Sequence, residues 1–278
     1  MSSFFQWVMS VASANLKLFA TAVGMCTIFW LIEIFRPSTT DIGIKGRLSN
    51  LARYALLLLG LALCTPLMVL ANSLLPAVSL IDRIAPDWRS QGLLGGVLAT
   101  LIYAVVWDFF QYWMHRLEHK LPVLWFFHRT HHSDAHMNSS TSLRQSLGGA
   151  MLGFFLTSIP AAIVCGGGML PYLGSLILFS GWGYFNHANI RVPLGPLGVV
   201  LSGPQWHRIH HGVSPQYHNC NYAAFFPIYD LLFGTLRLPQ KNEWVQTGIE
   251  NDLSCTSTFK QVFLPWLNDR STSKLADS

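Results

Sequence analysis

The amino-acid sequence predicts an all-α integral membrane protein: a bundle of about five membrane-embedded helices with a cytosolic histidine-rich helical cap. Three observations support this prediction. Only 11% of the 278 residues are charged, less than half of the about 25% in a soluble globular protein, and the mean hydropathy is +0.36. Five apolar stretches are long enough to enter a bilayer. Most of the 11 histidines follow these stretches in repeated spacings.

The five apolar stretches define the expected helices, since a spanning helix needs about 20 apolar residues. They run over Leu18 to Phe35, Tyr54 to Leu75, Leu93 to Met114, Leu147 to Cys165 and Met169 to Phe185. We expect the first to be a retained helix rather than a signal peptide, because no small-residue cleavage site follows it. The last two are separated by Gly166 to Gly168 and form a tight hairpin, which either crosses the bilayer fully, as we favour, or re-enters from the cytosol.

Lys and Arg residues orient the helices, because cations collect in cytosolic connections. They concentrate in the first loop, in the loop after the third helix and in the segment after the fifth helix. This places the N-terminus outside and the histidines in the cytosol, in a multi-pass protein of a cell inner membrane or an endoplasmic-reticulum-type membrane. Although the net charge is +5, the cations form no continuous basic stripe, so no nucleic-acid partner is expected.

We expect three segments along the chain. Residues 1–92 contain N-terminal membrane helices and loops, residues 93–237 form the catalytic domain, and residues 238–278 form a C-terminal tail. The five cysteines contain no C-x-x-C pair, which argues against both a thiolate zinc site and a disulfide framework.

Nine histidines follow helical spacings that suit metal binding. The set comprises His115, His119, His128, His131, His132, His187, His207, His210 and His211. In H-x3-H both rings project from one face of a helix. In each H-x2-H-H motif the first and last rings share a face, and the middle ring turns about a quarter of the way round, toward a second metal or a bridging position. His136 and His218 lie outside these motifs.

Nine imidazoles are too many for one ion and suit two, each with an open coordination position. Imidazole binds Zn, Cu, Fe or Ni, so the ligand type alone does not choose the metal. An open pair at a membrane favours O2 activation by iron, and we expect two Fe ions. Asp108 and Tyr112 share a helix stripe with His115, and we expect them, with Asp230, to support the ligands from behind. Among the acids, Asp108, Glu118, Asp134 and Asp230 are candidate acceptors for ring N–H groups.

The residues around the histidines form a wider pattern. Its segments are Asp108 to Arg116, His128 to Ser133, Leu143 to Ser146, Phe185 to Ile190, Trp206 to His211 and Tyr229 to Thr235. In order and spacing they resemble the fatty acid hydroxylase superfamily, specifically its sterol desaturase-like branch, from about Leu94 to Arg237. The stretch from Asn138 to Ser146 is similar also to that of alkylglycerol monooxygenase. The resemblance implies a di-metal, all-histidine centre that hydroxylates or desaturates sterols, fatty acyl chains, alkyl glycerols or related lipids.

Two hypotheses of function remain open from the sequence. In the first, the chain is an O2-dependent lipid hydroxylase or desaturase with a lipid substrate and a separate electron donor. In the second, it binds metal without redox turnover, as a zinc-dependent lipid hydrolase or a metal transporter. A transporter should hold ionisable groups near the bilayer midplane, whereas Glu33 and Asp108 lie toward cytosolic ends. A hydrolase needs a general base, for which Glu118 is the candidate.

Overall fold

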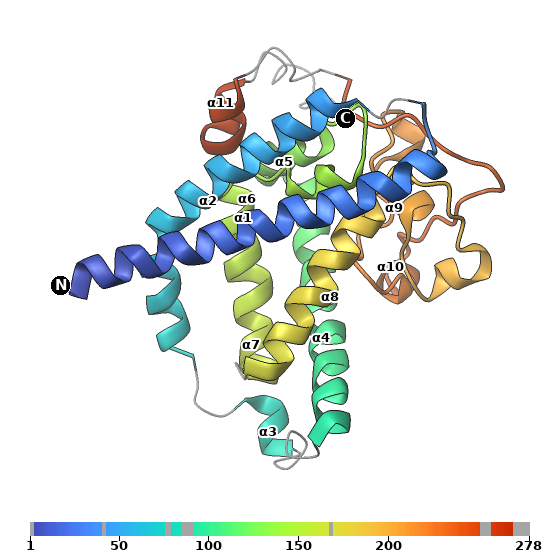
Figure 1. Ribbon diagram of the computed structural model, residues 1–278. Coiled ribbons are helices and arrows are strands. Elements are labelled where there is room, and N and C mark those ends of the chain that lie inside the picture. Colours follow the sequence, from blue (N-terminus) through green and yellow to red (C-terminus); the bar gives the residue numbers. More distant parts are fainter. Residues whose placement is uncertain are drawn as a thin grey trace.

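The computed structural model describes residues 3–40, 43–75, 79–84, 92–166, 169–250 and 257–268. Within these ranges every regular element is a helix, and the only β-pairing is two isolated bridges, Pro37 with Ile190 and Gly212 with Thr247. The predicted all-α class is therefore confirmed. Long helices form one part of the molecule, and short helices and loops form a cap over one end of it (Figure 1).

The first two helices, α1 (Ser3–Phe35) and α2 (Ile44–Ser73), pack against each other and run obliquely to the helices behind them (Figure 1). Both begin earlier than predicted. The first turns of α2 carry Arg47, Asn50 and Arg53, which are buried inside the protein. A hydropathy pattern excludes these turns from the predicted span because their side chains are polar, although these side chains are buried against other parts of the protein.

Three further helical segments run side by side. They are α4 (Gly92–Lys120), α8 (Met169–His187) and a nearly continuous segment made of α6 (Leu147–Gly153), the π-turn η2 (Phe154–Ser158) and α7 (Ile159–Cys165). The segment ends at Gly166, whose φ of 76° lies in the left-handed region that glycine adopts at low cost. This end packs near α3 (Leu80–Ile84), away from the cap (Figure 1).

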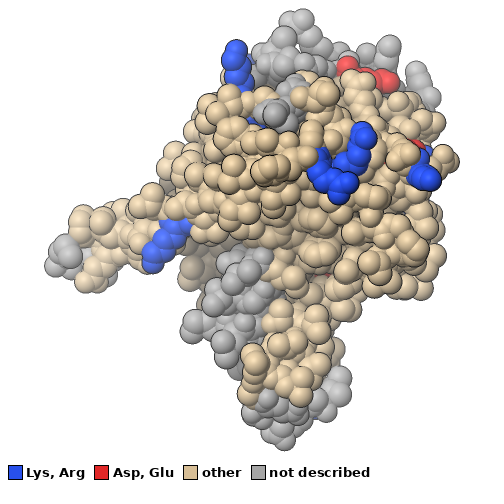
Figure 2. Space-filling model, turned by 45° about the vertical axis from the view of Figure 1, so that its right-hand side comes forward, with Lys and Arg blue, Asp and Glu red and all other residues tan. Residues whose placement is uncertain are grey.

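The described residues contain four helices long and apolar enough to cross a membrane, so the chain is a multi-pass membrane protein. They cover Phe4–Phe35, Ile44–Ser73, Gly92–Lys120 and Leu147–Cys165. The fifth predicted span, Met169 to Phe185, lies on α8, where the side chains of 169–177 fall outside the described residues, as do Gly167 and Gly168. A fifth crossing therefore stays a prediction. On the face shown in Figure 2, charged side chains gather toward the cap, with one cation on the projecting end of α1.

The cap consists of short elements. They are α5 (Pro122–His132), η1 (Ser139–Leu143), η3 (Gly195–Val199), α9 (Pro204–His210), η4 (Pro215–Tyr217), α10 (Ile228–Leu232), α11 (Thr258–Phe263) and η5 (Pro265–Asn268). Proline begins both α5 and α9, where its missing N–H is not needed by the helix.

The last described segment is docked on the cap rather than free. Gln261 Oε1 accepts from Arg53 Nε at 2.8 Å, and the Gln261 carbonyl accepts from Thr130 Oγ1 at 3.2 Å. Arg129 on α5 also donates to the carbonyl of Pro265. The predicted C-terminal tail thus contains two elements, α11 and η5, that pack against α2 and α5. The division into three segments at residues 92 and 237 stays a prediction.

Candidate metal centre

All nine histidines of the predicted set meet where the cap joins the long helices, and they form two groups. The five-histidine group contains His115, His119, His128, His132 and His210, and the four-histidine group contains His131, His187, His207 and His211. Within each group the candidate ligand atoms all lie within 4.8 Å of one another. The isolated His136 and His218 belong to neither group.

The two H-x2-H-H motifs are shared between the groups, as their spacing predicts. Helix α5 gives its first and last histidines to the five-histidine group and its middle one, His131, to the other. The motif on and after α9 does the reverse, since only its middle histidine, His210, joins the five-histidine group. Each motif therefore connects both groups. The rings of His132 and His211, one from each group, stack with centroids 4.2 Å apart.

Backbone carbonyls fix the tautomers of three rings. Nδ1 lies 2.7 Å from the Tyr222 carbonyl in His115, 2.8 Å from the Cys220 carbonyl in His210 and 2.7 Å from the Gly183 carbonyl in His187. A carbonyl oxygen can only accept, so Nδ1 of each ring carries the proton and Nε2 presents a bare lone pair. Metal-bound histidines are commonly held in this way.

The bare Nε2 atoms face other ring nitrogens inside their groups. His115 Nε2 lies 3.0 Å from that of His128, and His187 Nε2 lies 3.0 Å from those of both His131 and His207. In the five-histidine group, the buried Nε2 of His119 has no hydrogen-bond partner among the described residues. Converging lone pairs and a buried nitrogen without a partner fit a cation at the centre of each group.

The protonation state of the rings also suits a metal. Burial lowers the pKa of His128, His132 and His210 well below the usual value, and the neighbouring histidines lower it further. The same two causes lower the pKa of His131, His207 and His211. These rings are neutral at pH 7, which is the form that binds metal ions.

Asp108 was predicted to accept from a histidine ring. Its hydrogen-bond partners are backbone N–H groups instead. Its carboxylate accepts the backbone N–H groups of Ala224 at 2.7 Å, Phe225 at 3.1 Å and Phe226 at 2.7 Å. These amides belong to an irregular loop and would otherwise be buried without acceptors. Asp108 therefore acts on the site through the loop 222–226.

Asp230 holds the other part of this loop, and here too the predicted contact with a ring is wrong. It accepts the backbone N–H of Tyr222 at 2.8 Å and of Ala223 at 2.9 Å, and the hydroxyl of Thr235 at 2.7 Å. Because the Tyr222 carbonyl accepts from His115, the two aspartates position that ring indirectly. Sequence reasoning missed Tyr222, since its contact is made by a backbone atom.

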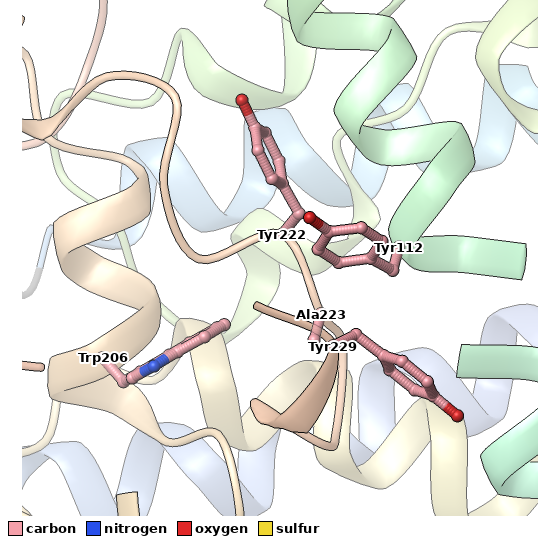
Figure 3. Close-up of a cluster of buried hydrophobic side chains, with 5 residues drawn as sticks. All are labelled: Tyr112, Trp206, Tyr222, Ala223 and Tyr229. Atoms are coloured by element: carbon pink, nitrogen blue, oxygen red, sulfur yellow. The ribbon is translucent and has the colours of Figure 1, made fainter. Parts of the chain in front are cut away.

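Tyr112 packs in a buried cluster with Trp206, Tyr222, Ala223 and Tyr229 (Figure 3). Its hydroxyl lies 2.9 Å from Thr235 Oγ1 and accepts from Arg116 Nη1 at 2.8 Å. Tyr112 was predicted to support the histidines, but its hydroxyl bonds Thr235 and Arg116 rather than a histidine ring. Tyr112 therefore supports the loop that holds His115.

Two other acids complete the predicted set. Glu118 contacts a ring, with Oε2 3.1 Å from His128 Nδ1. Asp134 accepts from Asn50 Nδ2 at 3.1 Å and Thr141 Oγ1 at 2.7 Å, so it ties α2 to η1 and touches no ring. Although burial alone would raise the pKa of Asp134, Arg144 and these hydrogen bonds lower it below the usual value. Asp134 is thus a buried anion in a polar network.

A cavity of about 200 Å³ adjoins both groups. The histidines that line it are His115 and His128 from one group and His131, His187 and His207 from the other. Trp107, Phe179 and Phe225 give it apolar walls, and Gln111, Ser142, Gln145 and Asn186 give it polar ones. A reactant in this space would contact both histidine groups at once.

The profile of the fatty acid hydroxylase family matches residues 100–235, which include every histidine of both groups. The chain carries a fatty acid hydroxylase domain. This domain begins within α4 and ends just after α10, and it leaves out the first two helices and the α11–η5 segment.

The names of similar proteins refer to several different lipids. The chain is 33% identical to human alkylglycerol monooxygenase over 156 residues, which are 56% of this chain and 34% of that protein. It is 31% identical to the ornithine lipid hydroxylase OlsE of Rhizobium tropici over 66% of this chain and 53% of that protein. It is 28% identical to a very-long-chain aldehyde decarbonylase, GL1-6 of Oryza sativa, over 55% of this chain and 25% of that protein.

The chain thus spans about a third of the length of the alkylglycerol monooxygenases that it matches. No solved structure matches it.

Proposed function

We propose that this chain is a membrane-bound di-iron oxidoreductase that uses O2 to hydroxylate or desaturate a C–H bond of a lipid. The observation that carries the proposal is the pair of adjoining all-histidine groups that share one cavity inside a fatty acid hydroxylase domain. We assign His115, His119, His128, His132 and His210 to one iron and His131, His187, His207 and His211 to the other.

When bound, the iron pair supplies the redox chemistry toward O2, and the protein supplies position and a dry environment. His115, His187 and His210 are fixed by carbonyl groups, so their lone pairs point inward before a metal arrives. The apolar walls formed by Trp107, Phe179 and Phe225 exclude water from the space beside the rings.

The proposed substrate is a lipid with a long alkyl chain. The names of the relatives refer to an alkylglycerol, an ornithine lipid and a very-long-chain aldehyde. These compounds are all lipids, but their polar parts differ. The cavity of about 200 Å³ is smaller than the about 300–1,000 Å³ of a typical site for a whole small molecule. It suits one segment of a chain, and helices α4 and α8, which line it, lead from the membrane-embedded part of the protein.

We place the centre on the cytosolic face of the membrane, with a separate electron donor that approaches from the cytosol. Support comes from the cations that follow the first, third and fifth apolar stretches. The long helices end in the cap that contains the histidines, so one face of the membrane serves the whole site (Figure 1).

The geometry gives less support to a zinc-dependent hydrolase. Such an enzyme needs a general base beside the substrate. Glu118, the candidate base, contacts the outward Nδ1 of His128 and is not among the residues that line the cavity. Its position suits a partner of a ligand better than a base.

Lipid analysis tests the proposal. Cells that express the wild-type chain or the His128→Ala variant are grown in parallel, and their lipid extracts are compared by mass spectrometry. We expect a lipid that gains the mass of one oxygen atom, or loses that of two hydrogen atoms, only with the wild-type chain. A hydrolysed lipid, in place of an oxygenated or dehydrogenated one, would contradict the redox proposal.

A further inference from the structure

Glu33 is an acidic residue near the end of α1, and its side chain is 0% exposed. It lies outside residues 100–235, the part that matches the fatty acid hydroxylase profile. Burying a carboxylate is unfavourable unless partners compensate for the lost water. The partners of Glu33 therefore indicate what this side chain does.

The carboxylate of Glu33 joins three parts of the chain. Its Oε1 accepts the backbone N–H of Ser139 in η1 at 2.8 Å and the backbone N–H of Asn189 after α8 at 2.8 Å. Its Oε2 pairs with Arg47 of α2, whose Nη1 also lies 3.4 Å from Ser139 Oγ. The charge is thus neutralised by Arg47, while the other oxygen organises two loops.

Both loops adjoin ligands of the four-histidine group. Asn189 is two residues after His187, the last residue of α8, and η1 packs against α8. The end of α1 makes further bonds to the segment after His187: Ser38 N donates to the Asn189 carbonyl at 3.2 Å, and Thr39 N donates to Asn189 Oδ1 at 3.0 Å. The chain beyond His187 therefore lies along residues 37–39, which follow the end of α1.

We propose that Glu33, with Arg47 as its counter-ion, is a positioning residue for the four-histidine group. The proposal rests on the metal centre described under Proposed function. Asp108 and Asp230 hold the loop behind the five-histidine group from within the hydroxylase domain. Glu33 holds the segment after His187 from outside that domain, so the helical hairpin α1–α2 is part of the site.

The test compares two variants of Glu33 with a matched control in the full-length, membrane-inserted chain. Glu33→Leu removes the acceptor for both loops. Glu33→Asp keeps the charge beside Arg47 and retracts the carboxylate by one methylene. The control is Asn15→Leu, which removes a hydrogen bond from α1 to the Leu58 carbonyl of α2 but touches neither loop. Iron per chain, its affinity in a chelator titration and the thermal unfolding temperature are measured for each.

We expect Glu33→Leu to retain the iron of the five-histidine group and lose the other, so that iron per chain falls by about half. Glu33→Asp should bind the more labile iron about 10–100-fold more weakly, the usual effect of losing a group that orients a ligand. Asn15→Leu, which loosens the α1–α2 contact away from both loops, should leave the iron content unchanged. If Glu33→Leu does not fold, Glu33→Asp decides alone.

Unchanged iron affinity in Glu33→Asp, or an equal loss of iron in Asn15→Leu, would overturn the inference. These results differ from a failure of the proposed function, which the wild-type chain reports in the same experiment. A wild-type chain that binds one ion, or none, would contradict the two-ion centre itself.

Discussion

The two histidine groups differ in how firmly their rings are held. In the five-histidine group, the outward nitrogens of His115 and His210 meet carbonyl oxygens. Glu118 Oε2 lies 3.1 Å from that of His128, without the geometry of a hydrogen bond. In the four-histidine group only His187 has a carbonyl partner, at 2.7 Å, and His131 Nδ1 lies 3.5 Å from Gln145 Nε2. The buried Nδ1 atoms of His207 and His211 have no partner among the described residues. The group with more ligands is thus also the more rigidly supported one.

The groups also differ in access to the cavity. Three of the four members of the smaller group line it, against two of the five members of the larger group. Fewer ligands, weaker support and greater contact with the cavity all belong to the same group. This asymmetry indicates that the five-histidine group anchors the centre, while the four-histidine group faces the reactants.

The largest expected effect is loss of turnover when either group is broken. His128→Ala and His211→Ala should each abolish activity, because each removes one ligand from one group. Membrane insertion should be unchanged, since it depends on apolar spans and cation asymmetry. Lipid product and membrane-fraction content are measured. The matched controls are His136→Ala and His218→Ala, which should keep measurable activity. Full activity in His128→Ala would mean that the anchor group is wrongly assigned.

The next largest effect concerns the metal itself. Elemental analysis of chain purified under aerobic, chelator-free conditions should give two iron ions per chain, one for each group. On chelator titration we expect two phases, with the four-histidine group losing its iron first, because its rings have fewer outward partners. His211→Ala should remove the early phase only. A single phase, or the early phase persisting in His211→Ala, would remove the proposed asymmetry.

A smaller effect is expected from the loop behind the five-histidine group. Asp108→Asn replaces a carboxylate that accepts three backbone N–H groups with an amide that accepts less strongly. The free energy of unfolding should fall by about 1–3 kcal/mol, as for the loss of hydrogen bonds to a charged group. Thermal or denaturant unfolding measures it.

Glu243→Gln provides the comparison for Asp108→Asn. Its carboxylate pairs at 2.8 Å with the partly exposed Arg237, a kind of ion pair worth about 0–1 kcal/mol. If both variants lose the same stability, the loop 222–226 is not held mainly by Asp108.

Single-cysteine variants that report the membrane topology should have no effect on activity. In a chain without native cysteines, Gly167→Cys places a single thiol between α7 and α8 in the sequence, and Gln216→Cys places one on an exposed cap position. An impermeant thiol reagent added to intact cells should label the first and spare the second if α7 and α8 both cross the membrane. Protection of both favours a re-entrant hairpin, and labelling at Gln216 would move both histidine groups to the outside.

The sequence predicted the site better than its supports. Helical geometry is local, so the sequence alone indicates which histidines share a helix face. It therefore indicates that the first and last histidines of each H-x2-H-H motif lie together and that the middle one points elsewhere. The roles of Asp108 and Asp230 could not be predicted, because both accept from backbone amides of the loop 222–226. For Asp108 that loop lies more than 100 residues away in the sequence. The early start of α2 was missed because Arg47 and Asn50 face protein, whereas hydropathy assumes lipid or water.

The docking of α11 and η5 has a consequence for how the protein is made. Helix α5, which carries histidines of both groups, is bonded by Thr130 to the Gln261 carbonyl at 3.2 Å and by Arg129 to the Pro265 carbonyl. During synthesis from the N-terminus, these two carbonyls emerge from the ribosome after every histidine has been translated. The ligands are therefore made before the two carbonyls that steady α5, and α5 gains these bonds only once the α11–η5 segment has been translated. Nascent chains arrested before Thr258 should remain open to exchange of any ion they capture.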